Sequence, residues 1–191
     1  MPRDFLVIDI ETKNTFDEVG GQQNLIKLDM SLIGVYSYNK GKFFAIREGN
    51  FHELDELFKN AALVVGFSII RFDLPILNKY VNFDLLRLPR VDLLHEIEQV
   101  LGRRISLDLL AKENLGVGKT GHGLDAIKYY KEGNWDALEK YCLQDVKVTR
   151  DLYELAKKQG YLMVPNKFSP HPTKVELDIK KFIIEAPNTL F

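Results

Sequence analysis

The sequence has one cysteine, no long apolar run and no surplus of basic charge. A single thiol, that of Cys142, cannot form an internal disulfide, and no secretion signal is visible, so we expect a cytoplasmic protein. The longest apolar stretches, such as residues 61–67, fall far short of the roughly 20 residues that a membrane-spanning helix needs. The sequence therefore predicts no membrane span.

The overall charge gives no sign of a nucleic-acid-binding protein. Lysine and arginine number 26 against 27 acidic residues, a net charge of −1, whereas nucleic-acid-binding domains usually carry a basic face. A site built from carboxylates lowers the net charge of the chain and so conceals a basic region elsewhere. Such a site can still accept a phosphate, because bound divalent cations neutralise the acids first. The charge must therefore be judged locally.

Length and composition fit one folded core. The 191 residues are 46% hydrophobic and 28% charged, close to the averages for globular proteins. The segment from residue 164 onward holds four of the seven prolines and shows little periodicity. We therefore predict a domain at residues 1–163 and a C-terminal extension at residues 164–191.

The order of elements predicts an α/β fold. Residues 5–10 (FLVIDI) are typical of a buried strand, and residues 31–38 and 42–47 predict an antiparallel hairpin around a glycine-containing turn. A helix predicted at 51–59 and a strand at 63–67 indicate that the chain returns through the helix to form a parallel strand. Beyond Asp92 the pattern is helical as far as Gly160, the expected C-cap. We expect a mixed sheet with flanking helices, compatible with an RNase H-like fold.

Two carboxylates stand at the end of the first predicted strand. Asp9 and Glu11 are two residues apart, so both side chains leave the same face of the strand. Such close like charges repel unless a cation or proton lies between them, and their hard oxygens favour Mg²⁺ or Mn²⁺. Two acids at a solvated strand end are the plain alternative, and the pair by itself does not decide between the two.

Three further residues extend this pattern. Asp73 opens a predicted helix before Pro75, where it could serve simply as a helix cap. Asp92 and Asp108, at the starts of later helices, are also interpreted as caps. Tyr141 and Asp145 are four residues apart on a predicted helix, so they share one face.

In their order and spacing these strings resemble the three motifs of the DEDD exonuclease superfamily, as in the proofreading domain of family B DNA polymerases. The family reads D-x-E, N-x-x-x-F-D and Y-x-x-x-D; this chain has DIE at 9–11, SIIRFD at 68–73 and YCLQD at 141–145. The chain also resembles stand-alone RNase H-like exonuclease domains, over roughly residues 4–160. Ser68 departs from the pattern, since the family has asparagine there.

The resemblance implies a 3′-to-5′ exonuclease that hydrolyses single-stranded or frayed DNA or RNA with two divalent cations, Mg²⁺ or Mn²⁺. The implied metal ligands are Asp9, Glu11, Asp73 and Asp145, with Tyr141 orienting the attacking water. We assign substrate contacts to the residues of the motifs and of the glycine-rich loop at 116–123 that could touch a nucleic-acid strand: Thr12, Ser68, Phe72, Lys119 and His122.

Two other functions stay open from the sequence. One is a catalytically silent nucleic-acid-binding or scaffold module of the same fold, although an unused carboxylate cluster would cost stability. The other is an endonuclease relative. A proofreading role would require a polymerase or helicase partner. The sequence does not distinguish DNA from RNA, because that choice depends on contacts to the 2′-hydroxyl.

Overall fold

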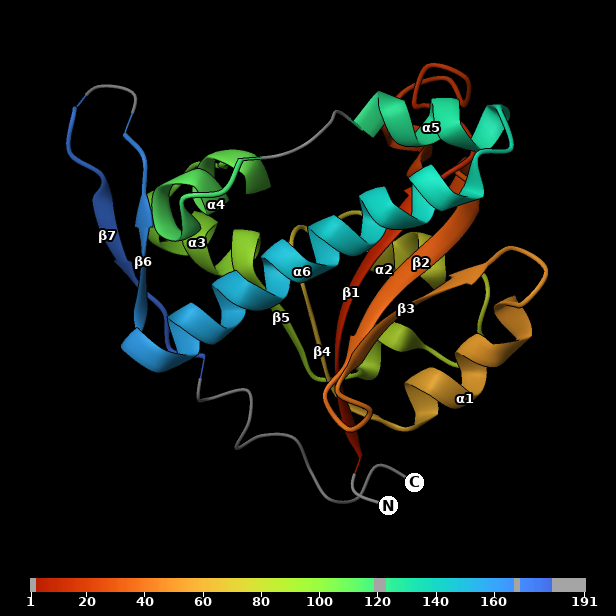
Figure 1. Cartoon of the computed structure of the whole chain (residues 1–191), viewed down its shortest axis with the longest axis horizontal. Helices are drawn as coiled ribbons and strands as arrows, with labels where there is room; N and C mark the ends of the chain where they lie inside the picture. Colours follow the sequence, from red (N-terminus) through yellow and green to blue (C-terminus); the bar gives the residue numbers. More distant parts are fainter. Residues whose placement is uncertain (1–2, 119–122, 167–168, 180–191) are drawn as a thin grey trace.

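The protein is described by a computed structural model that places residues 3–118, 123–166 and 169–179 (Figure 1). Its centre is a five-stranded sheet in the order β3-β2-β1-β4-β5. The strands are β1 (Asp4–Thr12), β2 (Met30–Ser37), β3 (Lys42–Arg47), β4 (Ala61–Gly66) and β5 (Arg90–Asp92). β1 pairs antiparallel with β2 and parallel with β4, so the mixed α/β sheet predicted from the sequence is confirmed.

Helices cover both faces of this sheet. The α-helices are α1 (Leu54–Lys59), α2 (Asp73–Leu77), α3 (Leu93–Leu101), α4 (Leu107–Leu115), α5 (Gly123–Lys131) and α6 (Trp135–Gln159). Short 3₁₀ turns lie at Gln22–Lys27, Phe51–Glu53 and Leu85–Arg87. The long helix α6 runs diagonally across one face of the sheet (Figure 1). It starts at an Asn134 cap and ends at Gly160, whose φ of 81° is left-handed, as a C-cap glycine requires.

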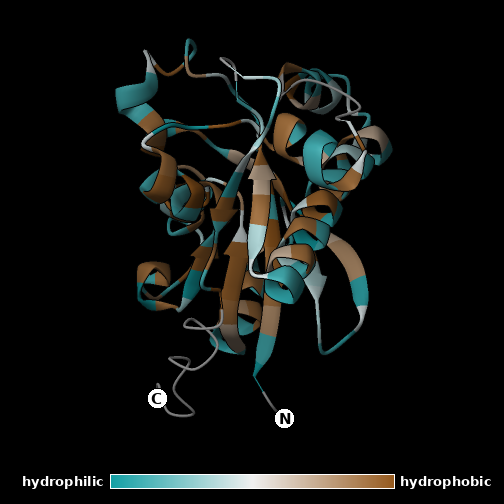
Figure 2. Ribbon diagram, turned by 90° about the vertical axis from the view of Figure 1, so that its left-hand side faces the viewer, coloured by the Kyte–Doolittle hydropathy of each residue, from teal (hydrophilic) through white to brown (hydrophobic). Residues whose placement is uncertain are grey.

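Apolar residues fill the space on either side of the sheet, and Figure 2 shows them concentrated along the strands and the inner sides of the helices. One cluster joins β1, β4 and β5 to α3, α4 and α6, with Val7, Val65 and Leu152 fully buried. A second joins the opposite face to α1 and α2, with Leu6 and Phe58 fully buried. Because successive residues of β1 point to opposite faces, one strand contributes to both clusters.

A glycine lets α6 approach the sheet closely. Gly34 of β2 lies beside Asp9 in the register, and a Cβ placed on it would come within 2.8 Å of Cys142 Sγ and 2.9 Å of Val146 Cγ2 on α6. A side chain at this position would therefore push the helix away from the sheet. The close contact brings α6 next to the end of β1.

The chain after α6 is more ordered than the sequence indicates. β6 (Tyr161–Val164) and β7 (Thr173–Glu176) form an antiparallel hairpin, and Val164, Val175 and Ile179 are buried against the α6 side of the core. Strands of four residues give too little alternation to detect from the sequence. None of the described helices combines the length and apolar character needed to cross a membrane.

Candidate metal-binding active site

A cleft of about 930 Å³ opens at the carboxyl ends of β1 and β4. Three separate parts of the chain contribute acids to it: the end of β1, the start of α2 and the middle of α6. Its lining includes all five predicted catalytic residues: Asp9, Glu11, Asp73, Tyr141 and Asp145. The structure therefore brings together, in one cavity, residues that are up to 136 positions apart (145 − 9) in the sequence.

The turn after β4 directs Asp73 toward β1. Phe72 occupies the N-cap position of α2, and Asp73 is the first residue of the helix. Asp73 is 3% exposed, and its Oδ1 accepts a hydrogen bond of 3.1 Å from the Ile10 backbone N–H, between Asp9 and Glu11. The side chain thus contacts the first motif, which a simple helix cap would not do.

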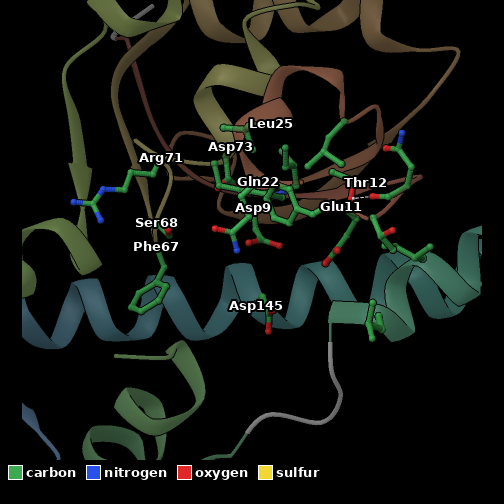
Figure 3. A pocket seen from close by; sticks show the side chains of 18 of the residues that line it. Asp9, Glu11, Thr12, Gln22, Leu25, Phe67, Ser68, Arg71, Asp73 and Asp145 are labelled. Atoms are coloured by element: carbon green, nitrogen blue, oxygen red, sulfur yellow. Dashed lines mark hydrogen bonds between the residues drawn. The ribbon is translucent and has the colours of Figure 1, made fainter. Parts of the chain in front are cut away.

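Helix α6 presents the third motif to the same cavity. Tyr141 and Asp145 lie one turn apart and are 8% and 9% exposed, so neither is a solvent-edge residue. Figure 3 shows Asp145 on α6, which passes beside Asp9 and Glu11, with Ser68 at one end of the group and Thr12 at the other. The four acids and the tyrosine therefore line the same cleft.

The acids destabilise one another's charged forms. Burial, followed by the charges of Glu11, Asp73 and Asp145, holds the pKa of Asp9 well above its usual range. Burial raises the pKa of Asp73 to about 7, although the Ile10 N–H acts in the opposite direction. At neutral pH this group of carboxyl groups needs protons or cations to offset its charge.

The donor set fits divalent cations. Carboxylate oxygens are the ligands preferred by Mg²⁺ and Mn²⁺, and atoms of Asp9, Glu11 and Cys142 capable of ligating a metal all lie within 4.8 Å of one another. Cys142 is fully buried, and its thiol donates to Asp9 Oδ2 at 3.5 Å. Burial, with the charges of Asp9 and Glu11, raises the pKa of this thiol well above normal, so it contributes packing rather than charge.

The predicted substrate-contacting residues separate into two groups. Thr12, Ser68 and Phe72 line the cleft, and Phe72 makes an edge-to-face contact with Phe16 at a ring-centroid distance of 6.0 Å. Thr12 is buried, and its hydroxyl donates to the Asn14 carbonyl. Lys119 and His122 lie outside the residues that the structure describes. The roles of all five remain predictions.

Sequence reasoning missed several residues of the cleft. Arg71 and Arg104 both contribute to its lining, and Leu124 and Ile127 of α5 add an apolar surface. Arg71 was visible inside the second motif, but Arg104 belongs to the connection between α3 and α4 and carries no motif signal.

One of the two predicted helix caps is wrong. Asp108 does not cap α4, because Ser106 holds that position. The prediction for Asp92, which caps α3, is confirmed.

Comparisons with known proteins agree with this architecture. The model of the RNase H superfamily matches residues 6–157. Among solved structures, the chain is similar to the family B DNA polymerase from the hyperthermophilic archaeon Pyrobaculum calidifontis, with a TM-score of 0.60 and 20% sequence identity. The match covers 82% of this chain but only 25% of the polymerase, and at this identity it shows a shared fold. A search of curated proteins gives no match.

Proposed function

The chain belongs to the RNase H superfamily, and from this premise we propose that it is a metal-dependent 3′-to-5′ exonuclease acting on single-stranded or frayed nucleic acid. The family and the fold support a nuclease; the direction of cleavage and the two-metal mechanism are the proposal. The observation that carries it is the convergence of four carboxylates and a tyrosine on one cleft. The resemblance of their three motifs to the DEDD exonucleases supplies the direction.

Each side chain has a place in this chemistry. Asp9 would contact both cations, Glu11 and Asp145 would complete the first site, and Asp73 would support the second. When bound, two cations supply an activated water and neutralise the leaving oxygen of the phosphodiester. Tyr141 lines the same cavity, where its hydroxyl would orient the attacking water by a hydrogen bond.

The walls of the cleft suit an unpaired strand end. Phe67, Phe72, Leu124 and Ile127 add apolar and aromatic surface to the acids. Aromatic rings bind unstacked bases by stacking, a mode that tolerates any base sequence. A duplex keeps its bases stacked inside the helix, so this surface favours single-stranded DNA or RNA, or frayed ends.

The direct test is incubation of the purified protein with single-stranded DNA and RNA oligonucleotides in Mg²⁺, Mn²⁺ or EDTA. We expect a 5′-labelled oligonucleotide to give a ladder that shortens one nucleotide at a time, and a 3′-labelled one to release labelled mononucleotide first. EDTA should stop both reactions. Internal fragments from both substrates would instead identify an endonuclease and would overturn the proposed direction.

A metal-binding measurement separates the enzyme from a silent module. A cation that binds only the folded state raises its stability by mass action. We expect Mn²⁺ to raise the melting temperature of the wild-type protein and to have little effect on Asp9→Asn. Absence of a shift in the wild type, together with absence of cleavage, would favour the non-catalytic module.

A further inference from the structure

Ser68, which stands where the similar polymerase motif has asparagine, has an unusual backbone. Its φ is +68°, and among the described residues it is the one non-glycine with a positive φ. Asparagine and aspartate are enriched in this left-handed region, whereas serine has no such preference. A residue keeps this conformation where its surroundings impose it, and such residues cluster at functional sites.

Asp92 binds the backbone of this turn. This aspartate is 3% exposed at the end of β5, and its two oxygens accept the backbone N–H of Ser68 at 2.7 Å and of Ile70 at 3.0 Å. The same carboxylate also caps α3. The turn that carries the second motif is therefore fixed from the protein interior, and the Ser68 hydroxyl has a defined position at the edge of the cleft.

That hydroxyl binds an arginine. Arg104 Nη2 donates to Ser68 Oγ at 2.9 Å, and both residues line the cleft that holds the four acids. A small hollow next to the cleft is lined by Ser68, Arg71, Arg104 and Glu98, which places the two arginines beside each other. Figure 3 shows Arg71 close to Ser68, with its side chain directed away from Asp9 and Glu11.

The two arginines differ in their charge partners. Arg71 is neutralised by Glu98, with an N–O distance of 3.0 Å. Within the described ranges, no carboxylate lies within ion-pair distance of Arg104, and the Ser68 hydroxyl is the partner that the structure gives it. A guanidinium has five N–H donors, so one bond to Ser68 leaves four for another acceptor. Arg104 is thus an exposed, oriented and uncompensated cation at the edge of the cleft.

We propose that Arg104, held by Ser68, is a substrate-binding residue that donates to a backbone phosphate of the nucleic-acid strand next to the phosphate that is cleaved. The planar guanidinium fork matches two phosphate oxygens, and phosphate contacts of this kind fix the register of a strand without reading its sequence. Serine is too short to reach far into the cleft, so in this chain its hydroxyl positions a longer, charged side chain. The inference rests on the proposed nuclease function, because it assigns the strand to this cleft.

The test is the salt dependence of oligonucleotide binding, measured in EDTA so that cleavage does not interfere. Fluorescence anisotropy of labelled oligo-dT and oligo-U would compare the wild type with Arg104→Gln, Arg104→Lys and Arg87→Gln. Arg87→Gln removes the same charge elsewhere: Arg87 pairs with Asp84 at 3.6 Å, and its side chain is 85% exposed before β5, at the end of the sheet away from the cleft. Cleavage in Mn²⁺ would be measured on the same proteins.

We expect Arg104→Gln to weaken binding about tenfold, the usual size of a hydrogen bond to a charged group. The slope of log Kd against log salt should fall by about 0.7, the value for one phosphate contact to a single strand. KM should rise by a similar factor, with kcat nearly unchanged. Arg104→Lys should keep the slope but lose part of the affinity, because lysine lacks the fork. Arg87→Gln should behave as wild type.

The outcomes separate this inference from the proposed function. A wild type that cleaves, together with an Arg104→Gln variant of unchanged slope and KM, would overturn the role of Arg104 and leave the nuclease intact. A wild type that binds without cleaving, with a reduced slope for Arg104→Gln, would support the phosphate contact and overturn the nuclease. A protein that neither binds nor cleaves either oligonucleotide would overturn both.

Discussion

The buried Asp92 at the end of strand β5 and the half-buried Asp9 near the end of β1 have opposite surroundings. Asp92 is enclosed by donors: its oxygens accept four backbone N–H groups at 2.7 to 3.2 Å, those of Ser68, Ile70, Leu94 and His95. Asp9 faces three other carboxylates, and burial followed by their charges raises its pKa. Folding accounts for the first arrangement, because each donor and acceptor is satisfied. It does not account for the second, which lowers stability unless a ligand offsets the charge.

The test of this contrast with the largest expected effect is Asp9→Asn. The change keeps the shape of the side chain but removes one charge of the proposed metal-binding set, so we expect kcat/KM for oligonucleotide cleavage to fall at least about a thousandfold. In EDTA, the free energy of unfolding should be unchanged or higher, because repulsion within the cluster decreases. Gel-based cleavage assays and urea denaturation measure the two effects. Full activity in the variant would remove Asp9 from the site.

Asp92→Ala should show the reverse pattern. It leaves buried N–H groups without an acceptor and removes the cap of α3, so we expect a loss of about 3 kcal/mol in the free energy of unfolding. Asp84→Ala is the matched control: Asp84 caps a 3₁₀ turn through Leu86 but is exposed, so the loss should stay below about 1 kcal/mol. Equal losses in urea denaturation would show that burial of Asp92 is not what matters.

Gly34→Ala tests the packing that brings the two sides of the acid cluster together. The new Cβ would lie 2.8 Å from Cys142 Sγ, so α6 must shift, and we expect a loss of about 1–3 kcal/mol in unfolding free energy. Since α6 carries Tyr141 and Asp145, cleavage should also slow. Gly118→Ala, where the nearest side-chain atom is 3.6 Å away, is the control and should be close to neutral. A neutral Gly34→Ala would show that α6 adjusts freely.

The same contrast explains what the sequence could predict. The alternation of β1 places Asp9 and Glu11 on one face, and helical spacing places Tyr141 and Asp145 on one face of α6. Local periodicity was therefore sufficient to predict that the members of each pair lie together. Arg104 could not be found in this way, because it meets Ser68 across 36 positions in a connection without regular pattern. The positive φ of Ser68 accompanies a hydrogen bond to Asp92, which is a tertiary contact. The domain division at residue 163 stays a prediction, although the chain beyond it contributes to the core.

The last prediction is a pH dependence of stability in EDTA. The pKa of Asp73 is raised to about 7 in the folded protein from 3.8, so between these values the native state holds a proton that the unfolded chain has released. Unfolding then releases protons, and the free energy of unfolding must fall as pH rises from 5 to 7.5.

Asp73→Asn should flatten this decline, whereas Asp84→Ala, at an exposed acid, should keep it. Saturating Mn²⁺ should reverse the decline in the wild type, because the cation binds the ionised carboxylates and competes with their protons. Denaturant titrations at several pH values measure the slope. A wild-type stability that rises steadily from pH 5 to 7.5 in EDTA would mean that groups of the protein itself offset the negative charge of the carboxylates. The contrast between Asp9 and Asp92 would then no longer indicate a metal ligand.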